Sequence, residues 1–212
     1  MGNNRGTAGY LLIQGAFILN KTLAYYNENA DKFILGTLNV DMMTIQKKYI
    51  SYIPKGGKVL DLGCGSGRDS LYFKELGYDV TAVDGSAEMC IQAEKNIGQP
   101  VINMTFDKLD YDAEFDGIWA CASLLHVPSS DIKDVLIKIE RALKTGGYFY
   151  FSVKYGDYEG EREGRYYTDY TEQSVETLFT AVPSLQKVDM WLTDDARPER
   201  NDRWINCIWV KK

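Results

Sequence analysis

The sequence is poor in the residues that build metal and redox centres, with a single histidine and four cysteines among 212 residues. The cysteines stand far apart, so the spacing of a zinc site and the CxxC pair of a redox centre are both missing. They are Cys64, Cys90, Cys121 and Cys207. We therefore predict no metal site, and we expect the reduced thiols that are typical of cytoplasmic proteins.

The sequence also lacks a basic stripe and a long apolar run. Its formal net charge is −6, which is unfavourable for a protein that must replace the counterions of a nucleic acid. The mostly apolar segment Tyr10–Leu19 is too short to span a bilayer. We therefore predict no nucleic-acid and no membrane partner. We expect residues 1–20 to form an N-terminal extension, disordered or packed on a single domain of residues 21–212.

What the sequence does contain is a regular alternation of short apolar strands with amphipathic helices. The predicted strands are Lys58–Leu62, Asp79–Val83, Val101–Thr105, Phe115–Cys121, Tyr148–Val153, Leu185–Leu192 and Trp204–Val210. The predicted helices are Leu23–Leu35, Asp41–Ile53, Arg68–Leu76, Ala87–Asn96, Asp131–Leu143 and one after Thr171. This alternation predicts an α/β fold with a parallel sheet and helices on both faces. The last two strands are joined by a short loop, which predicts an antiparallel hairpin.

The first strand leads into a glycine-rich loop within the segment VLDLGCGSGRDS, residues 59–70. Glycine at Gly63, Gly65 and Gly67 permits a tight turn and a close approach by a ligand, and the following helix offers free N–H groups. Such a loop can hold the pyrophosphate of a dinucleotide. However, Asp61 would repel a pyrophosphate, whereas it suits a ligand that carries an ammonium and a sulfonium group. The spacing D-x-G-x-G-x-G also differs from that of the dinucleotide fingerprint.

A second acidic residue ends the second predicted strand. Asp84 follows Gly63 by 21 positions, which is where a carboxylate is expected to accept hydrogen bonds from both hydroxyls of a ribose. The alternative role, an N-cap of the next helix, belongs better to Ser86. The sequence therefore predicts a nucleoside ligand at this edge of the sheet.

The runs DLGCGSGRDSLYF, VDGS and FDGIWACASLLHVP resemble small bacterial class I S-adenosylmethionine (SAM)-dependent methyltransferases. The first run is also similar to that of tellurite-resistance and thiopurine methyltransferases. The resemblance covers the chain from about Tyr25 to the C-terminus. It implies a Rossmann-like sheet of seven strands in the order 3-2-1-4-5-7-6, with the last strand antiparallel and N-terminal helices forming a lid.

The resemblance also implies where SAM and its product S-adenosylhomocysteine (SAH) bind. The methionine end would lie on the glycine loop and the end of the fourth strand, and the adenosine end near Asp84 and the third strand. The implied cofactor-binding residues are Asp61, Gly63, Cys64, Gly65, Gly67, Arg68, Asp84, Gly85, Ser86, Thr105, Phe106, Asp107, Ala120, Cys121 and Tyr26. Many relatives place an Asp against the adenine where this chain has Thr105, so the adenine partner stays open between Thr105, Asp107 and the backbone. Arg68 fits equally a contact to the methionine carboxylate and a pairing with Asp69.

The acceptor is expected beyond the carboxyl ends of the strands. His126, the only histidine, is a candidate general base there, or alternatively a packing residue. The loop of residues 154–170 contains five tyrosines and is expected to be a mobile lid. The candidate acceptor-binding residues are Tyr25, His126, Tyr155, Arg165, Tyr167 and Arg197. The charges of residues 194–203 are expected to pair mostly with one another.

From these residues we expect methyl transfer from SAM to a small molecule, with the acceptor atom open between N, O, S and a metalloid. The alternatives are a SAM-binding protein without catalysis and a NAD-dependent oxidoreductase, which Asp61 and the glycine spacing disfavour. We expect a monomer or a homodimer.

Overall fold

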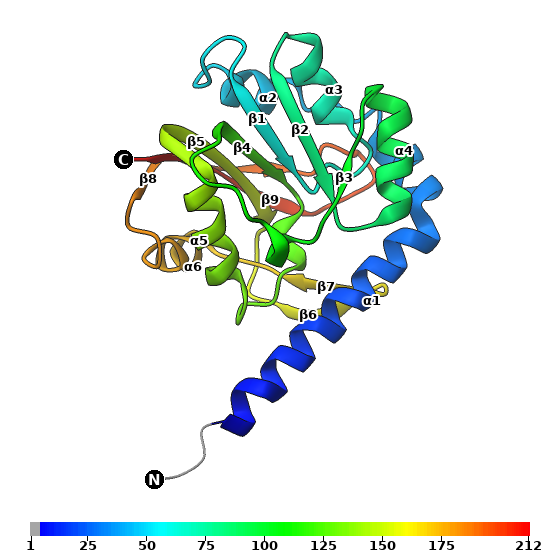
Figure 1. Cartoon of the computed structure of the whole chain (residues 1–212). Helices are drawn as coiled ribbons and strands as arrows, with labels where there is room; N and C mark the ends of the chain where they lie inside the picture. The colour runs from blue at the N-terminus through cyan, green and yellow to red at the C-terminus, as the bar shows by residue number, and fades with distance from the viewer. Residues whose placement is uncertain (1–4) are drawn as a thin grey trace.

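The computed structural model describes the backbone of residues 5–212 and the side chains of residues 21–212. Its helices are α1 (Arg5–Thr37), α2 (Met43–Ile50), α3 (Arg68–Glu75), α4 (Ala87–Ile97), α5 (Ile132–Ala142) and α6 (Glu172–Phe179), with short 3-10 helices η1 (Phe106–Lys108) and η2 (Leu124–His126). Its strands are β1 (Lys58–Leu62), β2 (Asp79–Asp84), β3 (Ile102–Asn103), β4 (Phe115–Cys121), β5 (Leu143–Lys154), β6 (Glu159–Arg162), β7 (Arg165–Thr168), β8 (Leu185–Asp194) and β9 (Arg203–Lys211). The alternation seen in the sequence is thus present along the whole domain (Figure 1).

Seven of these strands form one sheet in the order β3-β2-β1-β4-β5-β9-β8. The first five are parallel to one another, whereas β9 is antiparallel to both β5 and β8. The predicted fold class is therefore confirmed, including the antiparallel strand between β5 and β8. Because the carboxyl ends of the parallel strands share one edge, the loops after β1, β2, β4 and β5 come together there.

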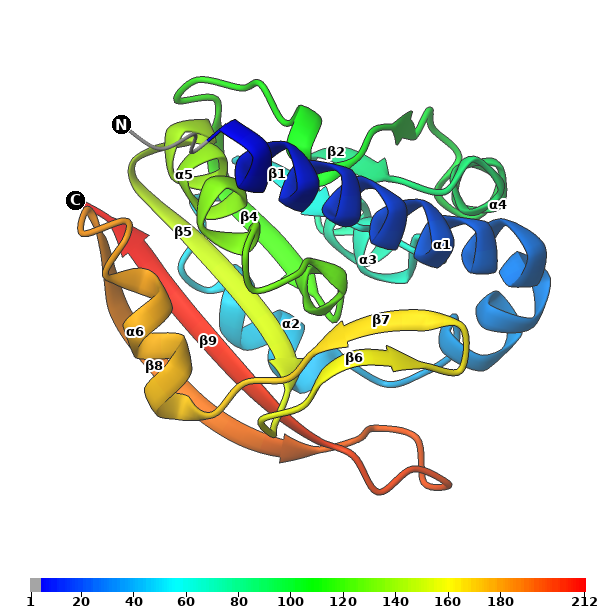
Figure 2. The same cartoon turned by 90° about the horizontal axis from the view of Figure 1, so that it is seen from below.

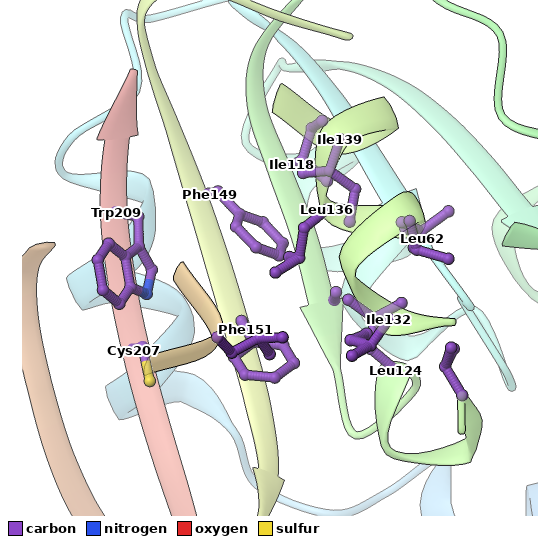
Figure 3. Packing of buried hydrophobic residues seen from close by; sticks show 14 of the residues in the cluster. Leu62, Ile118, Leu124, Ile132, Leu136, Ile139, Phe149, Phe151, Cys207 and Trp209 are labelled. Carbon is purple, nitrogen blue, oxygen red and sulfur yellow. The ribbon is translucent and has the colours of Figure 1, made fainter. Parts of the chain in front are cut away.

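The core lies on both faces of the sheet. On one face, apolar side chains of α5 and α6 pack against β4, β5 and β9, as Figure 3 shows for Leu136 and Phe149. On the other face, Tyr49 of α2 and Phe73 of α3 pack against Trp119, whose ring stacks on that of Tyr150 at 3.9 Å between centroids. Each large side chain buried in this way stabilises the fold by about 1.5–3 kcal/mol. The sheet edge that carries the loops is held rigidly as a result.

Helix α1 and the hairpin of β6 and β7 lie side by side below that edge, at the ends to which the arrows of β1 and β2 point (Figures 1 and 2). The backbone N–H of Tyr166 donates to the hydroxyl of Thr22 at 3.0 Å, and Lys21 pairs with Glu161 at 2.6 Å. Tyr167 and Tyr170 are buried. Within the predicted lid of residues 154–170, β6 and β7 form a two-stranded hairpin, which the sequence did not predict, and the mobility of this segment stays a prediction.

The predicted division of the chain at residue 20 stays a prediction. Residues 1–4 lie outside the described residues, and α1 begins at Arg5 and runs without interruption across residue 20. Of the helices in the described part of the chain, none has an apolar stretch long enough to cross a membrane.

Candidate active site

A cavity of about 430 Å³ opens at the carboxyl ends of the strands, beneath α1 and the β6–β7 hairpin. This volume is within the range of small-ligand pockets. Fourteen predicted site residues lie on its wall: Tyr26, Gly63, Cys64, Gly65, Arg68, Asp84, Gly85, Thr105, Phe106, Cys121, His126, Arg165, Tyr167 and Arg197. The structure therefore brings most of the predicted cofactor and acceptor residues together around one space.

The glycine loop is fixed in place by β2. The N–H groups of Gly63 and Cys64 both donate to the carbonyl of Val83, at 2.8 and 2.9 Å. The carboxylate of Asp84 then accepts from the N–H of Gly65 and from that of Ser86, each at 2.9 Å. Each of these oxygens keeps a lone pair for a hydroxyl of a ligand. Asp84 therefore holds the loop and still offers acceptors to the cavity, while burial raises its pKa.

Glycine is required at the last position of the loop for two reasons. Gly67 has φ +78°, and a Cβ there would lie 2.7 Å from Cγ1 and 2.8 Å from Cδ1 of buried Ile97. We expect Gly67→Ala to lower the free energy of unfolding by about 2–4 kcal/mol, which combines left-handed strain with overpacking. Chemical denaturation measures this loss.

Gly77→Ala is the matched control, because Gly77 has φ +85° and nothing within 4 Å of an added Cβ. Its free energy of unfolding should fall by only about 1–2 kcal/mol, which is the cost of a left-handed conformation for alanine. Equal losses in the two variants would show that the contact with Ile97 does not constrain the loop.

A buried cluster of charges lies behind the loop. Asp69 accepts hydrogen bonds from Gln46 at 2.6 Å, from Trp119 at 2.9 Å and from Arg68 at 2.8 Å. Burial raises the pKa of Asp69, but the charge and hydrogen bonds of Arg68 outweigh it and lower that pKa overall. Asp61 has one hydrogen bond, from Ser70 at 2.6 Å, and burial together with the charge of Asp69 raises its pKa to about 8. The cluster therefore favours an added positive charge nearby.

Of the two roles that the sequence left open for Arg68, the structure shows the pairing with Asp69, and the contact to a methionine carboxylate stays a prediction. Arg68 pairs with Asp69 and also donates to the carbonyl of Thr37 at 3.3 Å. Its side chain is 20% exposed and lies on the cavity wall. A carboxylate in the cavity could therefore still be bound by this guanidinium.

His126 is buried between two fixed partners. Its Nδ1 lies 2.5 Å from the carbonyl oxygen of Tyr166, and its Nε2 lies 2.9 Å from the hydroxyl of Tyr26. Because a carbonyl oxygen only accepts, Nδ1 carries the proton and Nε2 accepts from Tyr26. Burial lowers the pKa of His126 to about 4, partly opposed by the hydrogen bond with Tyr166. At neutral pH the ring is therefore uncharged, and its basic nitrogen already has a partner, which is unfavourable for a general base.

This burial predicts a specific dependence of stability on pH. The folded pKa of about 4 is below the ordinary value of 6.5, so the unfolded chain binds the proton more readily between these values. The stability contributed by neutral His126 is complete above pH 6.5 and is lost as the pH falls toward 4. We expect chemical denaturation to show about 2 kcal/mol more loss between pH 8 and pH 5 for the wild type than for His126→Gln. Equal losses would contradict a buried neutral ring.

The comparison with family models identifies residues 60–151 as a methyltransferase domain. This match runs from the glycine loop through Asp84 to β5, and so includes the part of the cavity wall formed by the glycine loop and Asp84. This segment is a methyltransferase domain, and the sequence and fold of the chain resemble those of class I SAM-dependent methyltransferases.

Relatives agree with this assignment. The malonyl-[acyl-carrier protein] O-methyltransferase of Salmonella typhimurium is 35% identical to the methyltransferase domain over 97 residues, which are 45% of this chain and 38% of that protein. The chain spans less than half the length of the curated relatives it matches.

Solved structures show the same fold. The 1,6-didemethyltoxoflavin-N1-methyltransferase of Burkholderia thailandensis has a TM-score of 0.77 at 23% identity, covering 100% of this chain and 93% of that chain. That structure contains 1,6-didemethyltoxoflavin and SAH. TehB of Haemophilus influenzae has a TM-score of 0.66 at 17% identity, covering 87% of this chain and 67% of that chain.

Seven predicted residues do not reach the cavity wall of the methyltransferase domain: Asp61, Gly67, Ser86, Asp107, Ala120, Tyr25 and Tyr155. Asp61 points with Val59 toward the face that α2 and α3 cover, because side chains alternate along a strand. Ser86 is the N-cap of α4, as predicted, and accepts from the N–H of Met89. Asp107 pairs with Lys108, and Tyr155 is 40% exposed. Their predicted direct contacts with ligands are therefore not supported by the geometry.

The structure adds wall residues that the sequence reasoning missed. They include the polar residues Asp69, Lys154 and Asn206, and two large rings, Trp191 and Trp204, come from the β8–β9 hairpin. Lys154 ends β5, so its position at a strand end was a usable signal. The tryptophans depend on the register of β8 with β9, which composition does not reveal.

Proposed function

We propose that this chain transfers a methyl group from SAM to a small-molecule acceptor in the cavity at the carboxyl ends of β1, β2, β4 and β5. The observation that carries the proposal is the chemistry of the wall around the glycine loop. Asp69 and Asp84 lie there with a single arginine, Arg68, so this part of the wall has an excess of negative charge. A cationic nucleoside fits such a wall, and a pyrophosphate does not.

The residues of the loop provide the remaining recognition. A Cβ at Gly65 would lie 3.6 Å from Phe33 and 3.9 Å from Met89, two residues of the wall, so glycine keeps the floor of the cavity open there. Asp84 accepts from the ribose hydroxyls, and Arg68 binds the methionine carboxylate. Thr105 and Phe106 flank the adenine. The toxoflavin methyltransferase, which has the same fold and contains SAH and 1,6-didemethyltoxoflavin, supports a cofactor and a small-molecule acceptor as the two ligands of this fold.

SAM supplies an activated methyl group, because its sulfonium makes the carbon electrophilic. The chain then has to orient the acceptor and to exclude water. Orientation supplies about 7–11 kcal/mol of barrier reduction. The cover of α1 and the β6–β7 hairpin excludes water, and the aromatic rings of Tyr26 and Tyr167 shape the space. His126 acts here through Tyr26, which it holds in place, rather than as a base.

The test is incubation with SAM carrying a labelled methyl group and a metabolite extract, followed by separation of the small molecules. We expect a labelled small-molecule product. Binding of SAH without any labelled product from a range of extracts would contradict catalysis and would favour a SAM-binding protein that acts without chemistry.

A further inference from the structure

The cavity has a second charged region, opposite in sign to the glycine loop. This part of the wall comes from β5, β7 and the β8–β9 loop, which lie together because Lys154 pairs with Asp202 at 2.7 Å and the N–H of Tyr155 donates to the carbonyl of Arg203. Its charged residues are four cations and two acids: Lys154, Arg165, Arg197, Arg200, Asp194 and Asp195. The cavity wall, as far as its residues are described, is therefore acidic toward the cofactor and basic toward the acceptor.

The cations differ in how well they are neutralised. Arg197 forms a close pair with Asp195 at 2.7 Å, and the side chain of Asp195 is only 3% exposed. Lys154 is neutralised in the same way by Asp202. Among the described side chains, Arg165 has only Glu163 as an ion-pair partner, at 3.2 Å, and the side chain of Glu163 is 72% exposed. Pairing with so exposed a carboxylate contributes little. Arg165 therefore keeps most of its charge available to a ligand.

The surroundings of Arg165 resemble those of a binding group. Its side chain is 10% exposed, and its Nε is buried with no hydrogen-bond partner among the side chains of residues 21–212 or the backbone of residues 5–212. The guanidinium lies 4.6 Å from the ring centre of Tyr25, 5.8 Å from that of Tyr26 and 5.3 Å from that of Tyr167. These rings fix its plane without neutralising it, and an unmade hydrogen bond at a buried donor is costly. Arg165 also lies on the cavity wall, where a ligand can reach it.

We propose that the acceptor is a planar organic anion, and that Arg165 binds its carboxylate or an equivalent anionic group. This inference rests on the proposed function, since it concerns the acceptor of that reaction. A guanidinium binds a planar anion through parallel N–H groups, which a lysine cannot do. The rings of Tyr167 and Trp204 on the same part of the wall suit a flat molecule.

The experiment uses the full chain saturated with SAH and two probes of the same shape, 2-naphthoate and 2-naphthamide. Calorimetry should show 2-naphthoate binding at least about tenfold more tightly than 2-naphthamide, as expected for a hydrogen bond between charged groups. Arg165→Met should remove this preference and leave the affinity for SAH unchanged. Glu163→Gln should strengthen 2-naphthoate binding, because the carboxylate of Glu163 competes with that of the probe for Arg165.

Arg162→Met is the matched control. Arg162 lies on the same hairpin, pairs with Asp169 and is absent from the cavity wall, so its loss should leave the preference intact. Equal affinities of the two probes for the wild type, no binding of 2-naphthoate, or an unchanged preference in folded Arg165→Met would each overturn the proposal. If Arg165→Met does not fold, two other measurements test the proposal: the preference of the wild type for 2-naphthoate over 2-naphthamide, and the increase in 2-naphthoate affinity in Glu163→Gln. Failure of the wild type to bind SAH would instead count against the proposed function.

Discussion

Replacing Asp84 with alanine is expected to weaken SAH binding by at least about 100-fold, the largest effect of any single substitution in this site. The carboxylate accepts from the N–H groups of Gly65 and Ser86 at 2.9 Å each, so its loss frees the glycine loop. The same substitution removes the proposed acceptor for the ribose hydroxyls. Hydrogen bonds to a charged group are worth about 1.5–3 kcal/mol each, so losing two of them suffices for this effect. Calorimetric titration with SAH measures it.

Asp79→Ala is the control, because Asp79 is the exposed first residue of the same strand, at its far end. It should bind SAH as the wild type does. Thermal unfolding of both variants separates loss of binding from loss of the fold. A folded Asp84→Ala protein with an affinity within about threefold of the wild type would contradict a ribose-binding role.

The affinity for SAM should fall between pH 8 and pH 6, by at most about 50-fold, because of Asp61. Burial and the neighbouring charge of Asp69 raise the pKa of Asp61 to about 8. Half of the molecules then carry the charge at pH 8, but only about 1 in 100 at pH 6. A cationic ligand binds the ionised form more tightly, so binding releases a proton and the affinity rises with pH until Asp61 is fully ionised. Calorimetry across this range measures both the affinity and the proton release.

The only histidine and the two thiols near the site do not titrate in this interval. The only histidine, His126, has its pKa lowered to about 4 by burial, and burial raises the pKa of Cys64 and Cys121. Asp61→Asn should therefore bind SAM more weakly than the wild type at pH 8, with an affinity that is nearly constant from pH 6 to pH 8. A wild-type affinity that does not change over this range would show that Asp61 is not coupled to the ligand.

The local structure around the candidate site was predicted correctly, whereas the ligand-binding roles of its residues stay predictions. The glycine loop follows from three glycines at fixed spacing, and Asp84 and Ser86 follow from the end of a strand and the start of a helix. The sheet order followed from the resemblance, and the final hairpin from a short loop. The hairpin of β6 and β7 was missed because its strands have four residues each and turn at Glu163 and Gly164, with φ +49° and +80°.

The roles of His126 and Asp61 depend on contacts between distant residues, and the sequence could not supply them. His126 was expected near the acceptor, where it does lie, but Tyr26 is 100 positions away and Tyr166 is 40 positions away. These partners and the burial remove its ability to act as a base near neutral pH. Asp61 was expected on the wall, yet the alternation along β1 directs it to Ser70, and its influence on a ligand is electrostatic instead.

The proposed reaction requires that the acidic wall selects a cationic nucleoside. Parallel calorimetric titrations of the full chain with SAM, SAH and NAD⁺ at pH 8 test this most directly. We predict saturable binding of SAM and SAH at one site per chain and no heat from NAD⁺. Tight binding of NAD⁺ with none of SAM or SAH would contradict the selection by charge and, with it, the proposed reaction.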